Sequence, residues 1–200
     1  MMEINKAEFV TSLAQYREGG PICLPQLAVV GKSNVGKSSL INTLCNRKKL
    51  CKVSGTPGKT KLINVFSIND SFHLVDLPGY GFAKVDKQEK IRWGEMMDDY
   101  FSSSTLLFSV FLLVDIRHEP TQEDNAMANY FREMDIPFFV IATKCDKISR
   151  GARLKYLAPI CRGLGVQPWQ ITPFSSEDGT GRSDLLGLIG ELLRELAGEK

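Results

Sequence analysis

The chain has 200 residues, of which 43% are hydrophobic and 24% are charged, and its formal net charge is +2. These values exclude a disordered or fibrous chain and fit one globular domain, which at this size buries about 70% of its unfolded surface without stabilising disulfides or metals. The small net charge gives no ground for assigning nucleic-acid binding from bulk charge alone.

The first 25 residues are expected to form an N-terminal extension that packs on the main domain, with a helix followed by a Gly-Gly-Pro connector. From residue 26 onward, short apolar or alternating runs predict strands over residues 27–30, 61–68, 72–76, 106–115, 137–143 and 170–174. The run at 61–68 is interpreted as an edge or second strand. Two of the runs, 106–115 and 137–143, are almost continuously apolar, as in strands buried on both faces of a parallel sheet.

Helical periodicity lies between these runs, over residues 39–46, 87–101, 121–134, 151–164 and 182–197. The last segment carries an apolar stripe that is interpreted as core packing rather than as a partner site. The alternation predicts an α/β fold, namely a three-layer, doubly wound, mostly parallel six-stranded sheet flanked by helices, formed by residues 26–200 as a single domain. In such folds ligands bind at the carboxyl ends of the strands.

Residues 31–38 read Gly-Lys-Ser-Asn-Val-Gly-Lys-Ser, a full match to the phosphate-binding loop (P-loop) pattern G-x-x-x-x-G-K-[ST]. The match lies between a predicted strand and a predicted helix, which is the context that the motif requires. Backbone N–H groups of such a loop turn around an anion, and the helix start adds a favourable dipole. We expect Lys37 to reach the β- and γ-phosphates of a nucleotide and the Ser38 hydroxyl to bind Mg²⁺.

Two further segments are expected beside the Mg²⁺ and the γ-phosphate. Residues 76–79, Asp-Leu-Pro-Gly, match D-x-x-G at a strand end. Asp76 is expected to hold Mg²⁺ through a water and the Gly79 N–H to contact the γ-phosphate, although the segment is also good turn chemistry. In the Thr-Pro-Gly-Lys-Thr run, Thr60 is preferred over Thr56 as the remaining Mg²⁺ ligand because it abuts the following strand, and its loop is expected to relax after hydrolysis.

The base is predicted from residues 143–146, Thr-Lys-Cys-Asp, which match [NT]-K-x-D directly after a buried run. The Asp146 carboxylate can accept from N1–H and the exocyclic amino group of guanine. Adenine presents no matching pair of donors, so its binding would leave the carboxylate unpaired. The free-energy cost of that unpaired group would exclude adenine. The Lys144 stem can lie along the purine face. Phe174-Ser175-Ser176 follows the last predicted strand, where the Ser176 N–H would donate to O6 of the base.

In chain order these motifs predict a site for GTP or GDP with Mg²⁺. The expected Mg²⁺ ligands are Ser38, Thr60 and, through a water, Asp76. The residues expected to contact the nucleotide are Gly31, Lys32, Ser33, Asn34, Val35, Gly36, Lys37, Ser38, Ser39, Gly58, Lys59, Thr60, Lys61, Leu62, Asp76, Leu77, Pro78, Gly79, Thr143, Lys144, Cys145, Asp146, Phe174, Ser175 and Ser176.

The P-loop and the Ser-Leu-Ile-Asn after it, Thr-Pro-Gly-Lys-Thr, Thr-Lys-Cys-Asp and above all Asp-Leu-Pro-Gly-Tyr-Gly-Phe-Ala at residues 76–83 together resemble the EngB family of bacterial GTPases, also called YihA or YsxC. This family belongs to a class with TrmE, Era, EngA and the septins, and the resemblance runs over nearly the whole chain. It implies a Ras-like G domain of the P-loop NTPase type, a role in assembling the large ribosomal subunit, and a requirement for normal septation in cell division. The alternative is a related Era-like switch with another RNA or a membrane-linked target.

Hydrolysis is expected to be slow. In Ras-type GTPases a glutamine follows the D-x-x-G glycine and orients the attacking water, whereas this chain has Tyr80 there. In related GTPases an asparagine at the position of Asn34 helps to bind K⁺ beside the phosphates, and the alternative is that Asn34 only shapes the loop. We expect K⁺ or a partner to complete the chemistry, and a module that binds without hydrolysing is the other interpretation. The residues expected to act in hydrolysis are Lys37, Thr60, Gly79 and Asn34.

Basic residues gather in and beside the two predicted switch segments. Residues 47–61 hold six basic and no acidic side chains, and the second switch is followed by Lys84, Lys87, Lys90 and Arg92. Together with the resemblance, this distribution favours contact with the RNA phosphates of a ribosomal subunit, gated by GTP. An ordinary solvated loop is the alternative.

The cysteine pattern and the hydropathy favour the cytoplasm. The chain has five cysteines, an odd number, and no pair has C-x-x-C spacing, which suits a reducing compartment. Residues 1–9 lack the apolar core of a signal peptide. The longest apolar stretch, residues 106–114, is far below the ~20 residues of a membrane-spanning helix. We therefore expect a cytoplasmic monomer that does not bind membranes.

Overall fold

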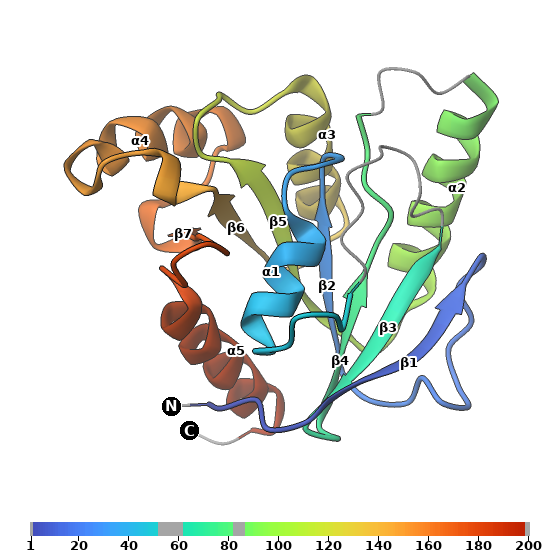
Figure 1. Cartoon of the computed structure of the whole chain (residues 1–200). Coiled ribbons are helices and arrows are strands. Elements are labelled where there is room, and N and C mark those ends of the chain that lie inside the picture. The colour runs from blue at the N-terminus through green and yellow to red at the C-terminus, as the bar shows by residue number, and fades with distance from the viewer. Residues whose placement is uncertain (1, 52–61, 82–86, 199–200) are drawn as a thin grey trace.

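The computed structural model describes residues 2–51, 62–81 and 87–198 (Figure 1). Its strands are β1 (Ala7–Leu13), β2 (Gln26–Gly31), β3 (Ile63–Ile68), β4 (Phe72–Asp76), β5 (Leu107–Asp115), β6 (Phe138–Thr143) and β7 (Ile171–Pro173). Its α-helices are α1 (Lys37–Leu44), α2 (Lys87–Ser103), α3 (Gln122–Glu133), α4 (Arg153–Leu164) and α5 (Arg182–Leu196). Short 3₁₀ turns cover Cys145–Lys147, Arg150–Ala152 and Pro168–Gln170.

The strands form one sheet in the order β1-β3-β4-β2-β5-β6-β7. Strands β4, β2, β5, β6 and β7 pair in parallel, whereas β3 pairs antiparallel with both of its neighbours, β1 and β4. Parallel strands end at the same edge of a sheet. The loops that follow Gly31, Asp76, Asp115 and Thr143 therefore leave the sheet on one side, and this edge carries the candidate site.

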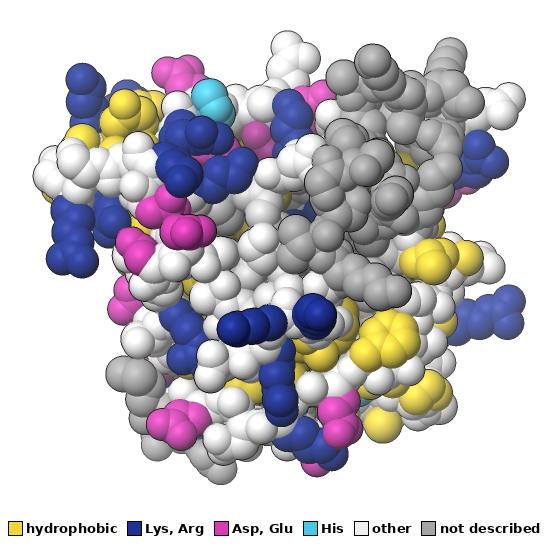
Figure 2. Space-filling view, viewed as in Figure 1, with side chains coloured by type: hydrophobic (Ala, Val, Ile, Leu, Met, Phe, Trp, Pro, Cys, Tyr) yellow, Lys and Arg dark blue, Asp and Glu magenta, His cyan; other side chains and the backbone are white. Residues whose placement is uncertain are grey.

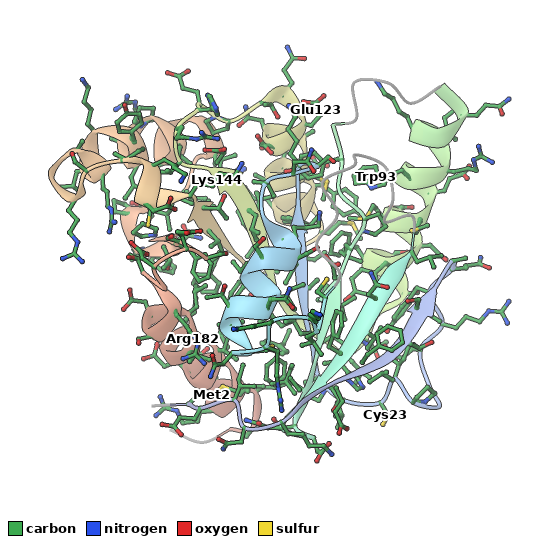
Figure 3. The ribbon with its side chains drawn as sticks, in the orientation of Figure 1. Met2, Cys23, Trp93, Glu123, Lys144 and Arg182 are labelled. Atoms are coloured by element: carbon green, nitrogen blue, oxygen red, sulfur yellow. The ribbon has the colours of Figure 1, made fainter. Side chains whose placement is uncertain are left out.

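Helices cover both faces of the sheet (Figure 1). Helices α1 and α5 pack on one face around Leu40, Ile41, Leu185 and Ile189, and α2, α3 and α4 pack on the other. Arg182 at the start of α5 donates to the carbonyl oxygens of the last residues of α1, Thr43 and Leu44, at 2.9 and 3.1 Å (Figure 3). The predicted three-layer, doubly wound α/β fold is confirmed.

One part of the fold prediction is wrong: the sheet has seven strands, not six, and the helix expected within the first 25 residues is strand β1. β1 pairs with β3 from Ala7 opposite Ile68 to Leu13 opposite Ile63, so β3 is not an edge strand. Ala7, Glu8 and Leu13 give the segment a weak helical preference, although Phe9, Val10 and Thr11 between them are typical of strands. Pairing with a distant strand overrides that weak preference.

Across the three described ranges, every helix is too short or too polar to cross a membrane.

Candidate functional site at the carboxyl edge of the sheet

The P-loop connects the end of β2 to the start of α1. Gly31 leaves no room for a side chain, since a Cβ there would lie 2.8 Å from the carbonyl oxygen of Leu113 on β5. Asn34 and Gly36 have positive φ values of 62° and 113°, which turn the chain so that α1 begins at Lys37. A loop that turns into a helix in this way presents backbone N–H groups to an anion.

Asp76 ends β4 next to the P-loop and is only 1% exposed. Burial raises the pKa of this carboxyl group, and the positive charge of Lys37 partly offsets the shift. Burial also lowers the pKa of Lys37, against the influence of Asp76. Within the described residues Asp76 Oδ1 has no hydrogen-bond partner. A buried carboxylate oxygen without a protein donor suits a cation or its bound water, so the chemistry of this position fits Mg²⁺.

Cys51 lies beside Asp76, although no sequence motif marks this cysteine. Its Sγ is 3.5 Å from Asp76 Oδ2. Asn42 of α1 holds the Cys51 backbone in place, donating to its carbonyl oxygen and accepting from its N–H, both at 2.8 Å. Burial and then the charge of Asp76 raise the pKa of the thiol to about 12, so it stays protonated at neutral pH. The polar Asn42 on the P-loop helix is the sequence signal that could have located this contact.

Residues 78–81 lie directly on the P-loop. The Ser33 N–H donates to the Tyr80 carbonyl oxygen at 2.8 Å, and Lys32 and Tyr80 form a parallel β-bridge. A Cβ at Gly79 would lie 2.9 Å from Lys37 Nζ and 3.2 Å from Ser33 Cα. A side chain here would press on the P-loop, so the tight space suits glycine, and the Gly79 backbone is brought beside the ammonium group of Lys37.

The end of β6 is tied to the P-loop by Thr143 and Lys144. Thr143 Oγ1 lies 2.7 Å from the carbonyl oxygen of Val35 and 3.0 Å from that of Val114, so its single proton joins β6 to the P-loop or to β5. Lys144, which has a φ of 62°, donates from Nζ to the carbonyl oxygen of Asn34 at 3.1 Å (Figure 3). Residues 143–146, which the sequence predicts to bind guanine, are thus joined directly to the P-loop.

Asp115 at the end of β5 holds Lys144 from the other side, with 2.9 Å between Oδ2 and Nζ. Arg117 donates to both oxygens of the same carboxylate, at 2.9 and 2.7 Å. Burial favours a higher pKa for Asp115, but the hydrogen bonds from Arg117 and Lys144 outweigh it and hold the pKa well below its usual value. The carboxylate is therefore charged at neutral pH and fixes the position of Lys144.

Asp146 presents its carboxylate at the same edge. Its Oδ1 accepts from Ser175 Oγ at 2.8 Å, and its Oδ2 lies 3.0 Å from Lys147 Nζ. Burial acts to raise the pKa of Asp146, but the ion pair with Lys147 and the hydrogen bond from Ser175 outweigh it and lower the pKa. Ser175 is itself buried and accepts from the N–H groups of Glu177 and Asp178 at 3.1 and 3.3 Å. Ser175 therefore orients Asp146, a function that no sequence pattern indicates.

Comparison with known proteins agrees with this geometry. The family model described as 50S ribosome-binding GTPase matches residues 26–144. A "Probable GTP-binding protein EngB" from Desulfitobacterium hafniense is 46% identical over 96% of this chain and 96% of that protein. One of the same name from an Exiguobacterium species is 46% identical over 97% of this chain and 99% of that protein. The chain belongs to the EngB family. Binding and hydrolysis of GTP are therefore its activities.

Solved structures share the fold of this EngB-family chain. The crystal structure of a probable GTP-binding protein EngB has a TM-score of 0.71 at 26% identity and covers 85% of this chain and 99% of that one. Era in complex with MgGDPNP and nucleotides 1506–1542 of 16S ribosomal RNA has a TM-score of 0.66 at 23% identity and covers 84% of this chain and 56% of that one. The second likeness shows the fold alone.

The EngB-family fold brings the P-loop, residues 76–79 and residues 143–146 to one edge, as the sequence predicts. Gly58, Lys59, Thr60 and Lys61, with the competing Thr56, lie outside the described residues. Leu62, which precedes β3, is 40% exposed, and Ser176 is exposed beside Ser175. Four of the expected contact residues bury their side chains in the two cores, so only their backbones can face a nucleotide: Val35, Leu77, Cys145 and Phe174.

Proposed function

We propose that this chain is a GTP-dependent switch in the assembly of the large ribosomal subunit, acting in the cytoplasm, and that normal septation depends on it. The observation that carries the nucleotide-binding part of the proposal is the 3.1 Å link from Lys144 Nζ to the Asn34 carbonyl oxygen, because it joins residues 143–146 to the phosphate-binding loop. The description of the matching family, 50S ribosome-binding GTPase, supports the target.

Within this site we propose a role for each of the following residues. Lys37 contacts the β- and γ-phosphates, the Gly79 N–H reads the γ-phosphate, and Asp146 reads the guanine. Ser38, Thr60 and, through a water, Asp76 would hold Mg²⁺, which supplies charge neutralisation at the phosphate oxygens. The buried, unpaired Oδ1 of Asp76 supports the metal site within the described residues. A K⁺ ion beside Asn34 is the proposed means of completing the chemistry.

The RNA contact is proposed for the exposed basic residues near the switch segments. Arg47, Lys48 and Lys49 are exposed after α1, and Lys90 and Arg92 are exposed on α2. Figure 2 shows Lys and Arg side chains gathered over the end of α1. Such residues bind RNA phosphates mainly through charge and counterion release, so the binding is expected to weaken steeply with added salt.

The proposal is tested by co-sedimentation of the protein with purified large and small ribosomal subunits, in GDP or in a non-hydrolysable GTP analogue. We expect retention on the large subunit that depends on the GTP analogue and falls with added salt. Preferential retention on the small subunit would favour the Era-like alternative, and equal retention with both nucleotides would refute the switch.

A variant with altered base specificity makes this test sharper. Asp146→Asn is expected to exchange guanine for xanthine recognition, since the new amide can donate to the 2-oxo group of xanthine. Co-sedimentation of that variant should then follow the xanthosine triphosphate analogue and ignore the GTP analogue. Retention that still follows the GTP analogue would show that a different site controls binding to the subunit.

A further inference from the structure

Tyr80 occupies the position that follows the D-x-x-G glycine, but its hydroxyl points away from the P-loop. The phenol oxygen lies 2.5 Å from Oδ1 of Asp124 on α3, and both side chains are buried, with 4% and 5% exposure. Burial and the charge of Asp124 raise the pKa of Tyr80 well above its usual value, so the phenol remains a donor. Its hydroxyl is therefore fixed to α3 and does not orient a water at the phosphates.

Asp124 also caps the first turn of α3. Its Oδ2 accepts from the backbone N–H and from Oγ1 of Thr121, at 2.8 and 2.9 Å, and Thr121 in return caps the Asp124 N–H. This reciprocal arrangement is a capping box, which satisfies N–H groups that the first turn of a helix leaves unpaired. One buried carboxylate therefore holds both the first turn of α3 and the residue after Gly79.

A second helix holds the same segment. Trp93 of α2 donates from Nε1 to the Pro78 carbonyl oxygen at 3.0 Å. Its ring packs edge-on against the Tyr80 ring, with 5.9 Å between centroids. Figure 3 shows Trp93 on the side of α2 that faces the sheet. Residues 78–80 are thus held by α2 and α3 on one side and by the P-loop on the other.

The backbone of Tyr80 connects these helix contacts to the P-loop. Its carbonyl oxygen accepts from Ser33, and the adjacent Gly79 approaches Lys37 so closely that a Cβ would lie 2.9 Å from Nζ. Among the described residues the Gly79 N–H has no acceptor. The contact with Asp124 restricts where the Tyr80 backbone can lie, and the planar peptide bond that joins Tyr80 to Gly79 extends this restriction to the Gly79 carbonyl group.

We propose that Tyr80 is a positioning residue whose hydroxyl, held by Asp124, fixes the Gly79 N–H beside Lys37 and couples recognition of the γ-phosphate to helix α3. The inference rests on the proposed contact of Gly79 with the γ-phosphate. This role differs from that of the glutamine in Ras-type GTPases. Tyr80 affects discrimination between GTP and GDP through the backbone of Gly79, and its side chain takes no part in hydrolysis.

The test compares Tyr80→Phe with the unaltered protein in calorimetric titrations with GDP and with a non-hydrolysable GTP analogue. The substitution keeps the ring against Trp93 and removes only the hydroxyl. We expect affinity for the GTP analogue to fall about tenfold, a typical effect of losing a hydrogen bond to a charged group, with GDP affinity within about twofold of the unaltered value. Equal loss for both nucleotides, or an unchanged or raised affinity for the analogue, overturns the inference.

The matched control is Tyr130→Phe, which removes a hydroxyl that joins the same helices, α3 and α2, through Asp98 at 2.9 Å. It should change neither affinity, and a similar loss there would overturn the inference by showing that any contact between these helices suffices. Gly79→Ala tests the underlying proposal separately. A Cβ there would press on Lys37 and Ser33, so some loss is expected for both nucleotides, and the γ-phosphate contact predicts a larger loss for the GTP analogue than for GDP. Equal losses would refute the γ-phosphate contact whatever Tyr80→Phe does.

A fluorescence measurement covers the case in which Tyr80→Phe is too unstable to titrate. The chain has two tryptophans, so Trp169→Phe leaves Trp93, whose ring touches Tyr80, as the single reporter. At saturating nucleotide we expect Trp93 emission to differ between GDP and the GTP analogue. Identical emission in the two states would overturn the inference.

Discussion

The ammonium group of Lys144 lies 2.9 Å from the carboxylate of Asp115, across the ends of two neighbouring parallel strands, and 3.1 Å from the Asn34 carbonyl oxygen. One lysine therefore connects the end of β6, the end of the central strand β5 and the P-loop. Its position depends on a carboxylate outside every motif that marks the nucleotide site. Asp115 in turn is held by Arg117, so the lysine is supported by a chain of two charged contacts.

Replacing Asp115 by asparagine should weaken the binding of GDP and of the GTP analogue equally, because Lys144 loses its charged partner. The loss in affinity should be at most about tenfold, because the ion pair is partly exposed and solvent screens it. Calorimetric titration measures both affinities. Arg117→Ala is the control: it leaves the contact between Asp115 and Lys144 in place and should change binding less than about twofold. Unchanged affinities in Asp115→Asn would show that Lys144 needs no such support.

The Asp146→Asn variant should lose about 100-fold in affinity for GTP and gain affinity for xanthosine triphosphate. The reason is that an amide offers one acceptor and one donor where guanine requires two acceptors. Competition with a fluorescent nucleotide measures both effects. Ser175→Ala keeps the carboxylate but removes the hydroxyl that orients it at 2.8 Å, so a fall of only several-fold is expected. GTP affinity that survives Asp146→Asn would contradict the assignment of the base site.

Stability should decrease as the pH falls below about 6.5, because of His73. This residue on β4 is 2% exposed and neither ring nitrogen makes a well-formed hydrogen bond within the described residues. Burial lowers its pKa, partly offset by the backbone groups of Pro21 and Phe66. Between the lowered folded pKa and the unfolded value, the unfolded chain binds a proton that the folded chain does not. Folding then loses up to about 1.4 kcal/mol per pH unit.

Urea denaturation at pH 7.5 and pH 5.5 measures this effect. A His73→Phe variant removes the titrating group while keeping an apolar ring of similar size. The difference in unfolding free energy between the two pH values should shrink in that variant. The same difference in both proteins would assign the pH dependence to other groups.

GTP turnover should be faster in KCl than in NaCl at equal ionic strength if a K⁺ ion beside Asn34 supplies the charge that an arginine finger supplies elsewhere. Asn34→Ala should abolish the difference between the two salts. Steady-state phosphate release measures both. Equal rates in the two salts would leave Asn34 with the loop-shaping role alone, for which its positive φ of 62° suits an asparagine.

The sequence predicts the parts of the site that local patterns encode. The P-loop, Asp76 and Asp146 each lie at the end of an apolar run, and the rule that parallel strands end together brings them to one edge. The supporting contacts could not be predicted in this way. Ser175 meets Asp146, and Tyr80 meets Asp124, through side chains of segments far apart in the chain, and no periodicity or spacing records which side chains will touch.

Strand β1 could not be predicted from the sequence for a related physical reason. Its residues mix helix formers with the strand formers Phe9, Val10 and Thr11, and its conformation is decided by pairing with the edge of β3, at least fifty residues away along the chain. The 3₁₀ turn that begins at Cys145 is another tertiary consequence: Lys144 adopts a left-handed backbone conformation there while its side chain is held by Asp115.

The position of β1 also covers an edge of β3 that would otherwise be open to pairing with another chain. β3 reads Ile-Asn-Val-Phe-Ser-Ile, a run rich in branched and aromatic residues that would attract a strand from another molecule if its edge were free. β1 fills that edge and carries a register shift between Phe9 and Thr11, while the opposite edge is the three-residue β7 ending at Pro173. A chain shortened past Leu13 would expose β3 and should form aggregates at concentrations where the full chain stays dispersed.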